Sequence, residues 1–156
     1  MTLMLVGLVV FIGMHVFTTQ RGARAALIAR IGEGPYKGLY SLVSLAGLLM
    51  IGFGYGMWRA DGPAQLWYPP LWTRHLALTL MIPAAILLVA AYVPSHIRLW
   101  LKHPMLVAIK IWVLAHLLAN GDIATIVLAL AVLVWAVYAR ISMKRRDDPP
   151  KPAPRG

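Results

Sequence analysis

The stretch Ile123 to Ile141, IATIVLALAVLVWAVYARI, decides the fold class of this chain. It is almost wholly apolar, and a helix needs about 20 such residues to cross the hydrocarbon core of a bilayer. Four other stretches share this character: Thr2 to Phe17, Leu39 to Trp58, His75 to Val93 and Pro104 to Ala119. The sequence therefore predicts an all-α, polytopic membrane helix bundle with about five transmembrane helices.

The composition of the whole chain also fits a lipid environment. Its 156 residues are 60% hydrophobic and 13% charged, whereas roughly a quarter of the residues in an average soluble domain are charged. No basic region precedes the first apolar stretch and no small-residue cleavage site follows it, so we expect a retained helix and not a signal peptide. We expect residues 1–146 to form one transmembrane domain and the proline-rich residues 147–156 to form a disordered cytoplasmic tail.

The basic residues predict the orientation of the bundle. Of the 15 Lys and Arg residues, twelve lie in the first loop, the third loop and the C-terminal segment, whereas the other side keeps only Arg59 and Arg74, and Lys110 lies within an apolar stretch. Because Lys and Arg concentrate on the cytoplasmic side, this distribution predicts an N-out, C-in topology. The net charge of +10 then reflects topology and contact with anionic lipid, so we expect membrane lipid as a partner and no nucleic acid.

Two shorter patterns predict local features. In Gln20 to Ile31, Arg alternates with Ala, Leu and Ile at helical spacing, which is typical of a basic amphipathic helix on the inner membrane surface. The second apolar stretch contains Gly52 and Gly56, a small-x-x-x-small pair that lets helices approach closely in lipid. We expect this face to pack against a neighbouring helix, and a homo-oligomer is one way to supply that neighbour.

Histidines are the main candidates for chemistry. The chain has no cysteine, which excludes thiolate metal sites and the covalent attachment of c-type haem. Its acidic residues all lie in loops or in the tail, so catalysis by paired carboxylates is not expected. Of the histidines, His15 and His116 differ from the rest because they lie within apolar helices, where an ionisable side chain is costly and points to function.

The depths of these two histidines in the bilayer are similar. At about 1.5 Å per residue, His15 lies roughly 20 Å and His116 roughly 12 Å below the outer face of a core about 30 Å thick. Two imidazoles so placed on antiparallel helices are suited to ligating one haem iron from opposite sides. The alternative is that each histidine only hydrogen-bonds to a neighbouring helix. Lys110 either pairs with a haem propionate or extends along the helix to the inner interface.

Several blocks resemble the bacterial NnrU family over about residues 3 to 146. They are Gly13-Met14-His15, Tyr36 to Ser44 (YKGLYSLVS), Ala90 to Pro94 (AAYVP), and Lys102 to Gly121, which includes Lys102-His103-Pro104-Met105, Lys110-Ile111-Trp112 and Ala115 to Gly121 (AHLLANG). The resemblance implies a multi-pass protein of the bacterial inner (plasma) membrane, associated with denitrification and nitric oxide metabolism.

Two further resemblances set out the possible activities. The zeta-carotene isomerase of plants and cyanobacteria, a membrane haem b enzyme, is similar to this family, and its two histidine ligands fall by motif on His15 and His116. The block from His103 to Asn120 also resembles isoprenylcysteine and phospholipid methyltransferases, whose His-Pro motif helps to hold S-adenosylmethionine. This chain departs from that pattern, because it lacks the Tyr and Gly after His-Pro and the glutamates after the last helix.

These resemblances lead to three hypotheses. The first is an NnrU-type protein that binds haem b and acts as a haem-dependent isomerase or redox protein, with a small apolar substrate or nitric oxide as its further partner. The second is an S-adenosylmethionine-dependent membrane methyltransferase, and the third is a non-enzymatic helper of denitrification enzymes. For the first, His15 and His116 are the expected iron ligands, and His103, Lys110, Trp112 and Asn120 are the other expected cofactor-binding residues.

Overall fold

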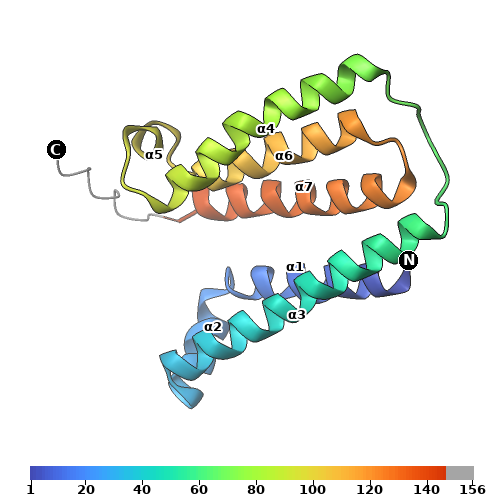
Figure 1. Cartoon of the computed structure of the whole chain (residues 1–156). Helices are drawn as coiled ribbons and strands as arrows, with labels where there is room; N and C mark the ends of the chain where they lie inside the picture. The colour runs from blue at the N-terminus through green and yellow to red at the C-terminus, as the bar shows by residue number, and fades with distance from the viewer. Residues whose placement is uncertain (147–156) are drawn as a thin grey trace. The chain divides into compact units, whose positions relative to one another are not determined.

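The computed structural model describes residues 1–146, and all its regular elements are helices apart from one isolated bridge (Figure 1). The prediction of an all-α fold is confirmed. The predicted disordered tail, residues 147–156, lies outside the described residues. The helices in chain order are α1 (Thr2–Phe17), α2 (Arg21–Ile31), α3 (Glu33–Ala60), α4 (Leu71–Tyr92), α5 (His96–Leu101), α6 (Pro104–Ala119) and α7 (Ile123–Lys144).

All five apolar stretches form helices, but three of these helices are longer than predicted. Helix α3 begins at Glu33 and not at Leu39, α4 begins at Leu71 and not at His75, and α7 ends at Lys144. The backbone hydrogen bonds of a helix form within the helix itself, in lipid as well as in water. A helix can therefore continue beyond the last apolar residue of a stretch. The expected helix at Gln20 to Ile31 is present as α2, whereas the short helix α5 was not predicted.

Helices α3, α4 and α7 are long and apolar enough to cross a membrane. Helices α1 and α2 pass the same test only as a pair, and the chain bends by 90° between them. Helix α6 is apolar but has 16 residues, which span about 24 Å of a core about 30 Å thick. The described residues thus contain three to four candidate membrane spans by length and composition.

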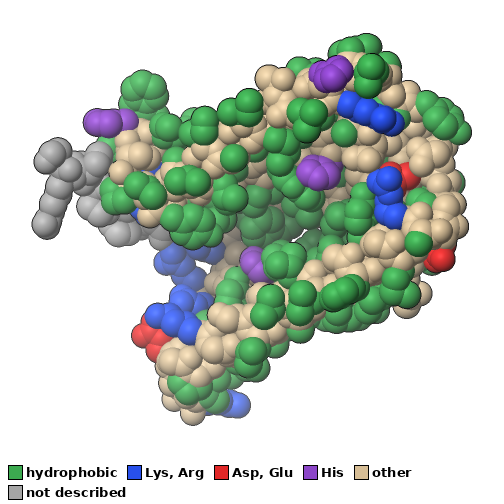
Figure 2. Space-filling model, viewed as in Figure 1, with side chains coloured by type: hydrophobic (Ala, Val, Ile, Leu, Met, Phe, Trp, Pro, Cys, Tyr) green, Lys and Arg blue, Asp and Glu red, His purple; other side chains and the backbone are tan. Residues whose placement is uncertain are grey.

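The outward faces of these helices are apolar. Phe53, Leu78 and Val134 are each about two-thirds exposed, and so many exposed large apolar side chains are expected where lipid is the solvent. Hydrophobic side chains are spread over the visible face of the molecule, whereas Lys and Arg lie in a few groups (Figure 2). The helices are therefore those of a membrane protein.

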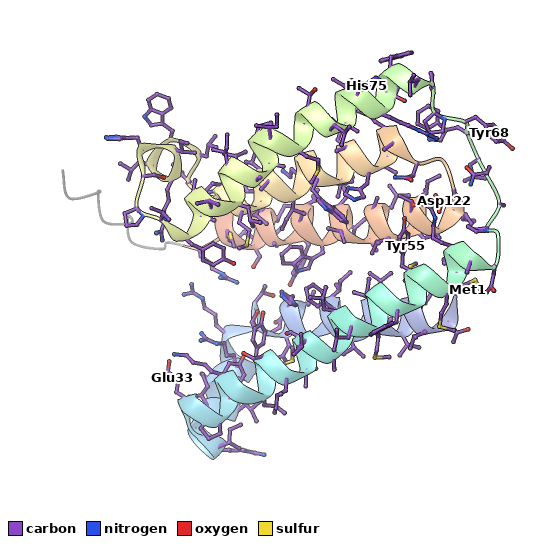
Figure 3. The ribbon with its side chains drawn as sticks, viewed as in Figure 1. Met1, Glu33, Tyr55, Tyr68, His75 and Asp122 are labelled. Carbon is purple, nitrogen blue, oxygen red and sulfur yellow. The ribbon has the colours of Figure 1, made fainter. Side chains whose placement is uncertain are left out.

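The chain forms two compact units, of which the first is Met1–Ala64. In this unit α1 and α3 are antiparallel: Met1 and Tyr55 lie at one end of the pair and Glu33 at the other (Figure 3). The backbones meet at glycines, because a Cβ atom on Gly54 would overlap the backbone of Met4, and one on Gly47 would lie 2.9 Å from the nitrogen of Phe11.

The other two glycines singled out in α3, Gly52 and Gly56, do not face α1, and their packing against a neighbouring helix stays a prediction. A Cβ atom on Gly52 or Gly56 would meet no atom within 4 Å. The close approach instead uses Gly47 and Gly54 of α3 and Gly7 of α1, where an added Cβ would lie 2.7 Å from the nitrogen of Ile51. The pattern of small residues shows that α3 has a face for close packing, but the partner helix decides which face is used.

The second unit begins at Gln65. Helix α6 contacts both α4 and α7, and a buried cluster of Leu106, Ala136 and Ala139 joins α6 to α7. The segment before α4 folds back on the α6–α7 loop: Gln65 forms an isolated bridge with Asp122, and the N–H of Leu66 donates to the carbonyl of Gly121 at 2.7 Å.

Candidate functional site

His15 lies in the last turn of α1, within the first unit. Its Nδ1 atom is 2.7 Å from the carbonyl oxygen of Phe11, one helical turn earlier. The Phe11 ring stacks on the imidazole with centroids 4.1 Å apart, and the ring of Tyr40 on α3 is tilted by 53° against the imidazole with a centroid distance of 5.5 Å. The half-buried imidazole thus contacts aromatic rings from both helices.

His116 lies in the last turn of α6, within the second unit. Its Nδ1 atom is 2.8 Å from the carbonyl oxygen of Trp112, again one turn earlier. The indole of Trp112 packs against the imidazole with centroids 4.0 Å apart. This ring is also half-buried.

The two histidines therefore have the same local geometry. A carbonyl oxygen only accepts hydrogen bonds, so Nδ1 carries the proton in both rings, and in the neutral imidazole the lone pair is on Nε2. Histidines that bind metals usually donate their other ring N–H to a carbonyl or carboxylate, which fixes the tautomer and the ring orientation. Nε2 is then the ring atom of each histidine that could bind a metal.

An aromatic residue lies four positions before each histidine, and only one of the two, Trp112, was among the predicted site residues. Phe11 precedes His15, and Trp112 precedes His116, at the i, i+4 spacing that places side chains on one helix face. Trp112 was singled out, but Phe11 and Tyr40 were missed. The repeated spacing could have identified Phe11, whereas Tyr40 requires knowledge of how α1 pairs with α3.

The other predicted site residues of α6 are divided between two surroundings. Asn120 lies beside His116, because its Nδ2 atom donates to the carbonyl of His116 at 3.2 Å. His103 is half-buried and lies directly before α6, whose first residue, Pro104, is buried. Lys110 is exposed. Its side chain is therefore not part of the contact between Trp112 and His116.

Asp122 is a buried acid near His116 along the chain, and it has a structural role. It is 2% exposed, and its Oδ2 atom accepts the N–H of Thr125 at 2.9 Å, which caps the first turn of α7. The hydroxyl of Thr125 also donates to this carboxylate. Figure 3 shows Asp122 at the end of the unit where the segment carrying Tyr68 passes.

Within residues 1–146, no three or more His, Asp and Glu side chains gather as a site for a metal ion. Such a cluster is needed where the protein supplies the whole coordination sphere, as in zinc sites. Haem iron needs only one or two protein ligands, because the porphyrin supplies the others. Isolated histidines with fixed tautomers therefore fit a haem better than a free metal ion.

Comparison with known proteins gives one match. No curated protein and no solved structure matches the chain. The family model described as NnrU protein matches residues 3–156, which is nearly the whole chain. The resemblance inferred from the blocks around His15, Tyr36 to Ser44 and Lys102 to Gly121 is confirmed, and the chain belongs to the NnrU family.

Proposed function

We propose that this NnrU-family protein binds one haem b within the bacterial inner membrane, with His15 and His116 as the axial ligands of the iron. The observation that carries the proposal is their shared geometry: each Nδ1 donates to the i−4 carbonyl, and each ring packs on the i−4 aromatic side chain. The hydrogen bond and the ring contact both restrict the rotation of the imidazole, so less side-chain entropy is lost when Nε2 binds iron.

The absence of cysteine makes this haem non-covalent, of the b type. With imidazole on both faces, the iron has no open position, which favours electron transfer over direct binding of a gas. We place this activity in nitric oxide metabolism and denitrification, as the resemblance to the family implies. The one-electron chemistry belongs to the haem, and the residues of the chain hold it and exclude water around it.

The proposal includes the membrane topology expected from the basic residues. Five crossings with an outer N-terminus place the basic helix α2 and the Arg and Lys of the C-terminal segment on the inner side. For α1 and α6, which are shorter than the bilayer core, crossing requires tilting or local thinning of the bilayer. In this arrangement α1 and α6 cross the membrane in opposite directions.

The test is the visible absorption spectrum of protein purified in detergent from cells supplied with haem precursor. We expect a Soret band typical of a six-coordinate, low-spin haem, and its loss or conversion to a high-spin form in His15→Ala and in His116→Ala. His75→Ala in the second turn of α4 and His96→Ala at the start of α5 are the matched controls and should keep the wild-type spectrum.

Two outcomes contradict the proposal. One is a spectrum that His15→Ala and His116→Ala leave unchanged, which would assign the haem to other ligands. The other is a folded, colourless protein despite haem supply. In that case binding of S-adenosylmethionine, measured by calorimetry, would favour the methyltransferase hypothesis, and its absence would favour the non-enzymatic helper.

A further inference from the structure

A row of polar and aromatic side chains runs through the first unit from His15 to α2. The ring of Tyr40 follows that of His15, and the ring of Tyr36 follows that of Tyr40 with centroids 6.4 Å apart. The guanidinium carbon of Arg24, on α2, lies 5.6 Å from the centroid of the Tyr36 ring. The row therefore begins at the proposed iron ligand and ends at a cation.

Tyr36 is the unusual member of this row. It is 2% exposed, and its buried hydroxyl has no hydrogen-bond partner among the described residues. A buried donor without a partner costs about 1–3 kcal/mol. Such groups in native structures call for an explanation, of which an absent ion or ligand is one.

The backbone places the cation over the ring that carries this hydroxyl. Gly32 separates α2 from α3 and has φ of +89° and ψ of 161°, a conformation that is essentially restricted to glycine. The reversal at Gly32 turns α2 back on α3, so that Arg24 faces Tyr36. The acid next to this turn, Glu33, forms an ion pair with Lys37 at 2.8 Å, and the charge of Arg24 also acts on it.

We propose that the Tyr36 hydroxyl and the Arg24 guanidinium form a binding site for one oxyanion, either a carboxylate or a phosphate. The hydroxyl donates one hydrogen bond, and the guanidinium supplies a positive charge and further donors in a planar fork that suits both groups. Two sources offer this chemistry where α2 meets α3. One is a propionate of the haem at His15, which rests on the proposed function, and the other is the phosphate of a membrane lipid.

The experiment has two arms and compares the full-length wild type with Arg24→Gln and Tyr36→Phe. Arg30→Gln removes a charge from an exposed position of the same helix, and Tyr68→Phe removes a hydroxyl from an exposed loop residue, so these variants are the matched controls. In the lipid arm, haem-free protein in detergent is heated with dioctanoyl phosphatidylglycerol or with dioctanoylglycerol, which has no phosphate. In the haem arm, haem-free protein is titrated with haem or with haem dimethyl ester, whose propionates carry no charge.

A phosphate ligand predicts that phosphatidylglycerol raises the unfolding midpoint of the wild type and of both controls, but not of Arg24→Gln or Tyr36→Phe. A propionate ligand predicts that the wild type and the controls bind haem roughly ten- to hundredfold more tightly than the ester, as expected for a charge-assisted hydrogen bond. This preference should be lost in the two site variants. A positive result in either arm supports the site and identifies the source of its anion.

The site is overturned if neither arm separates Arg24→Gln and Tyr36→Phe from the controls. Failure of the proposed function is distinguishable from this result, because a protein that binds no haem still gives an answer in the lipid arm. Without lipid or haem, Tyr36→Phe should unfold at or above the temperature of the wild type, since it removes a buried hydroxyl that lacks a partner. That measurement shows that any loss of binding is not a loss of folding.

Discussion

The Nδ1 atom of His116 lies 2.8 Å from the carbonyl oxygen of Trp112, and the two side-chain rings pack with centroids 4.0 Å apart. One residue thus fixes both the tautomer and the plane of the imidazole. His15 and Phe11 repeat the arrangement on α1. Because two histidines from separate units share this geometry, we expect them to have a common role.

Replacing His116 by Gly should open one coordination position on the iron. We expect the reduced variant to bind carbon monoxide with a clear shift of the Soret band, because the iron then lacks one imidazole. The reduced wild type and the His75→Gly control should bind little. Added imidazole should restore the wild-type spectrum of His116→Gly. Carbon monoxide binding by the wild type as strong as that by the variant would rule out two histidine ligands.

Gly54→Ala should destabilise the first unit. The added Cβ atom would overlap the backbone of Met4, and overpacking of this kind costs about 1–3 kcal/mol. Gly52→Ala, two residues away, adds the same atom where no neighbour lies within 4 Å, and should be neutral. Thermal unfolding in detergent, followed by circular dichroism, compares the two. Equal midpoints would show that α1 and α3 do not meet at Gly54.

Gly32→Ala should lower the free energy of unfolding by about 1–3 kcal/mol, the cost of holding a residue with a side chain in this backbone conformation. The cost arises from the backbone, since an added Cβ atom would lie at an ordinary distance of 3.6 Å from Pro35. Gly34→Ala, in the first turn of α3 with nothing within 4 Å, is the control and should lose no stability. Denaturant unfolding of both variants gives the comparison, and a Gly32→Ala protein as stable as the wild type would contradict the reversal.

Asp122→Ala should destabilise α7 by about 0.5–2 kcal/mol, the usual cost of losing a side-chain cap at a helix N-terminus. The carboxylate bonds both the N–H and the hydroxyl of Thr125, so the hydroxyl of Thr125 also loses a partner. Asp61→Ala removes an acid from an exposed position and should change the unfolding midpoint little. An equal effect of the two substitutions would contradict the capping role.

The topology can be tested with single cysteines, because the chain has none of its own. In right-side-out vesicles, an impermeant maleimide should label Asp61→Cys directly, but label Ala26→Cys, His96→Cys and Lys144→Cys only after permeabilisation. Labelling of Ala26→Cys and Asp61→Cys from one side would show that α3 does not cross. Opposite sides for His96→Cys and Lys144→Cys would show that α6 and α7 do not both cross.

The sequence predicted the helices well where apolar side chains and helical backbone end together. Both bounds of α1 and α6 agree with the apolar stretches Thr2 to Phe17 and Pro104 to Ala119. Prediction was less accurate for α3, whose first turns, from Glu33, are polar but still helical. Hydropathy reports the solvent around a segment, whereas helix bounds follow backbone hydrogen bonding.

The candidate site was predictable in part. Histidines within apolar helices are visible in the sequence, and so His15 and His116 were identified. The contacts between helices were not identified. Tyr40 contacts His15 only because α1 pairs with α3. Tyr36 contacts Arg24 only because the chain reverses at Gly32. The glycines that face α1 could not be predicted for the same reason, since Gly54 and Gly52 differ in what lies opposite them.

The bond from Leu66 to Gly121 has a consequence for how the protein is made. The amide of Leu66 leaves the ribosome long before its acceptor does, so the second unit stays open at this end until the chain has been synthesised beyond Gly121. The first unit, in contrast, has all its residues once synthesis passes Ala64. The first helical hairpin can therefore settle in the membrane early, whereas the second unit is completed late and depends longer on the insertion machinery.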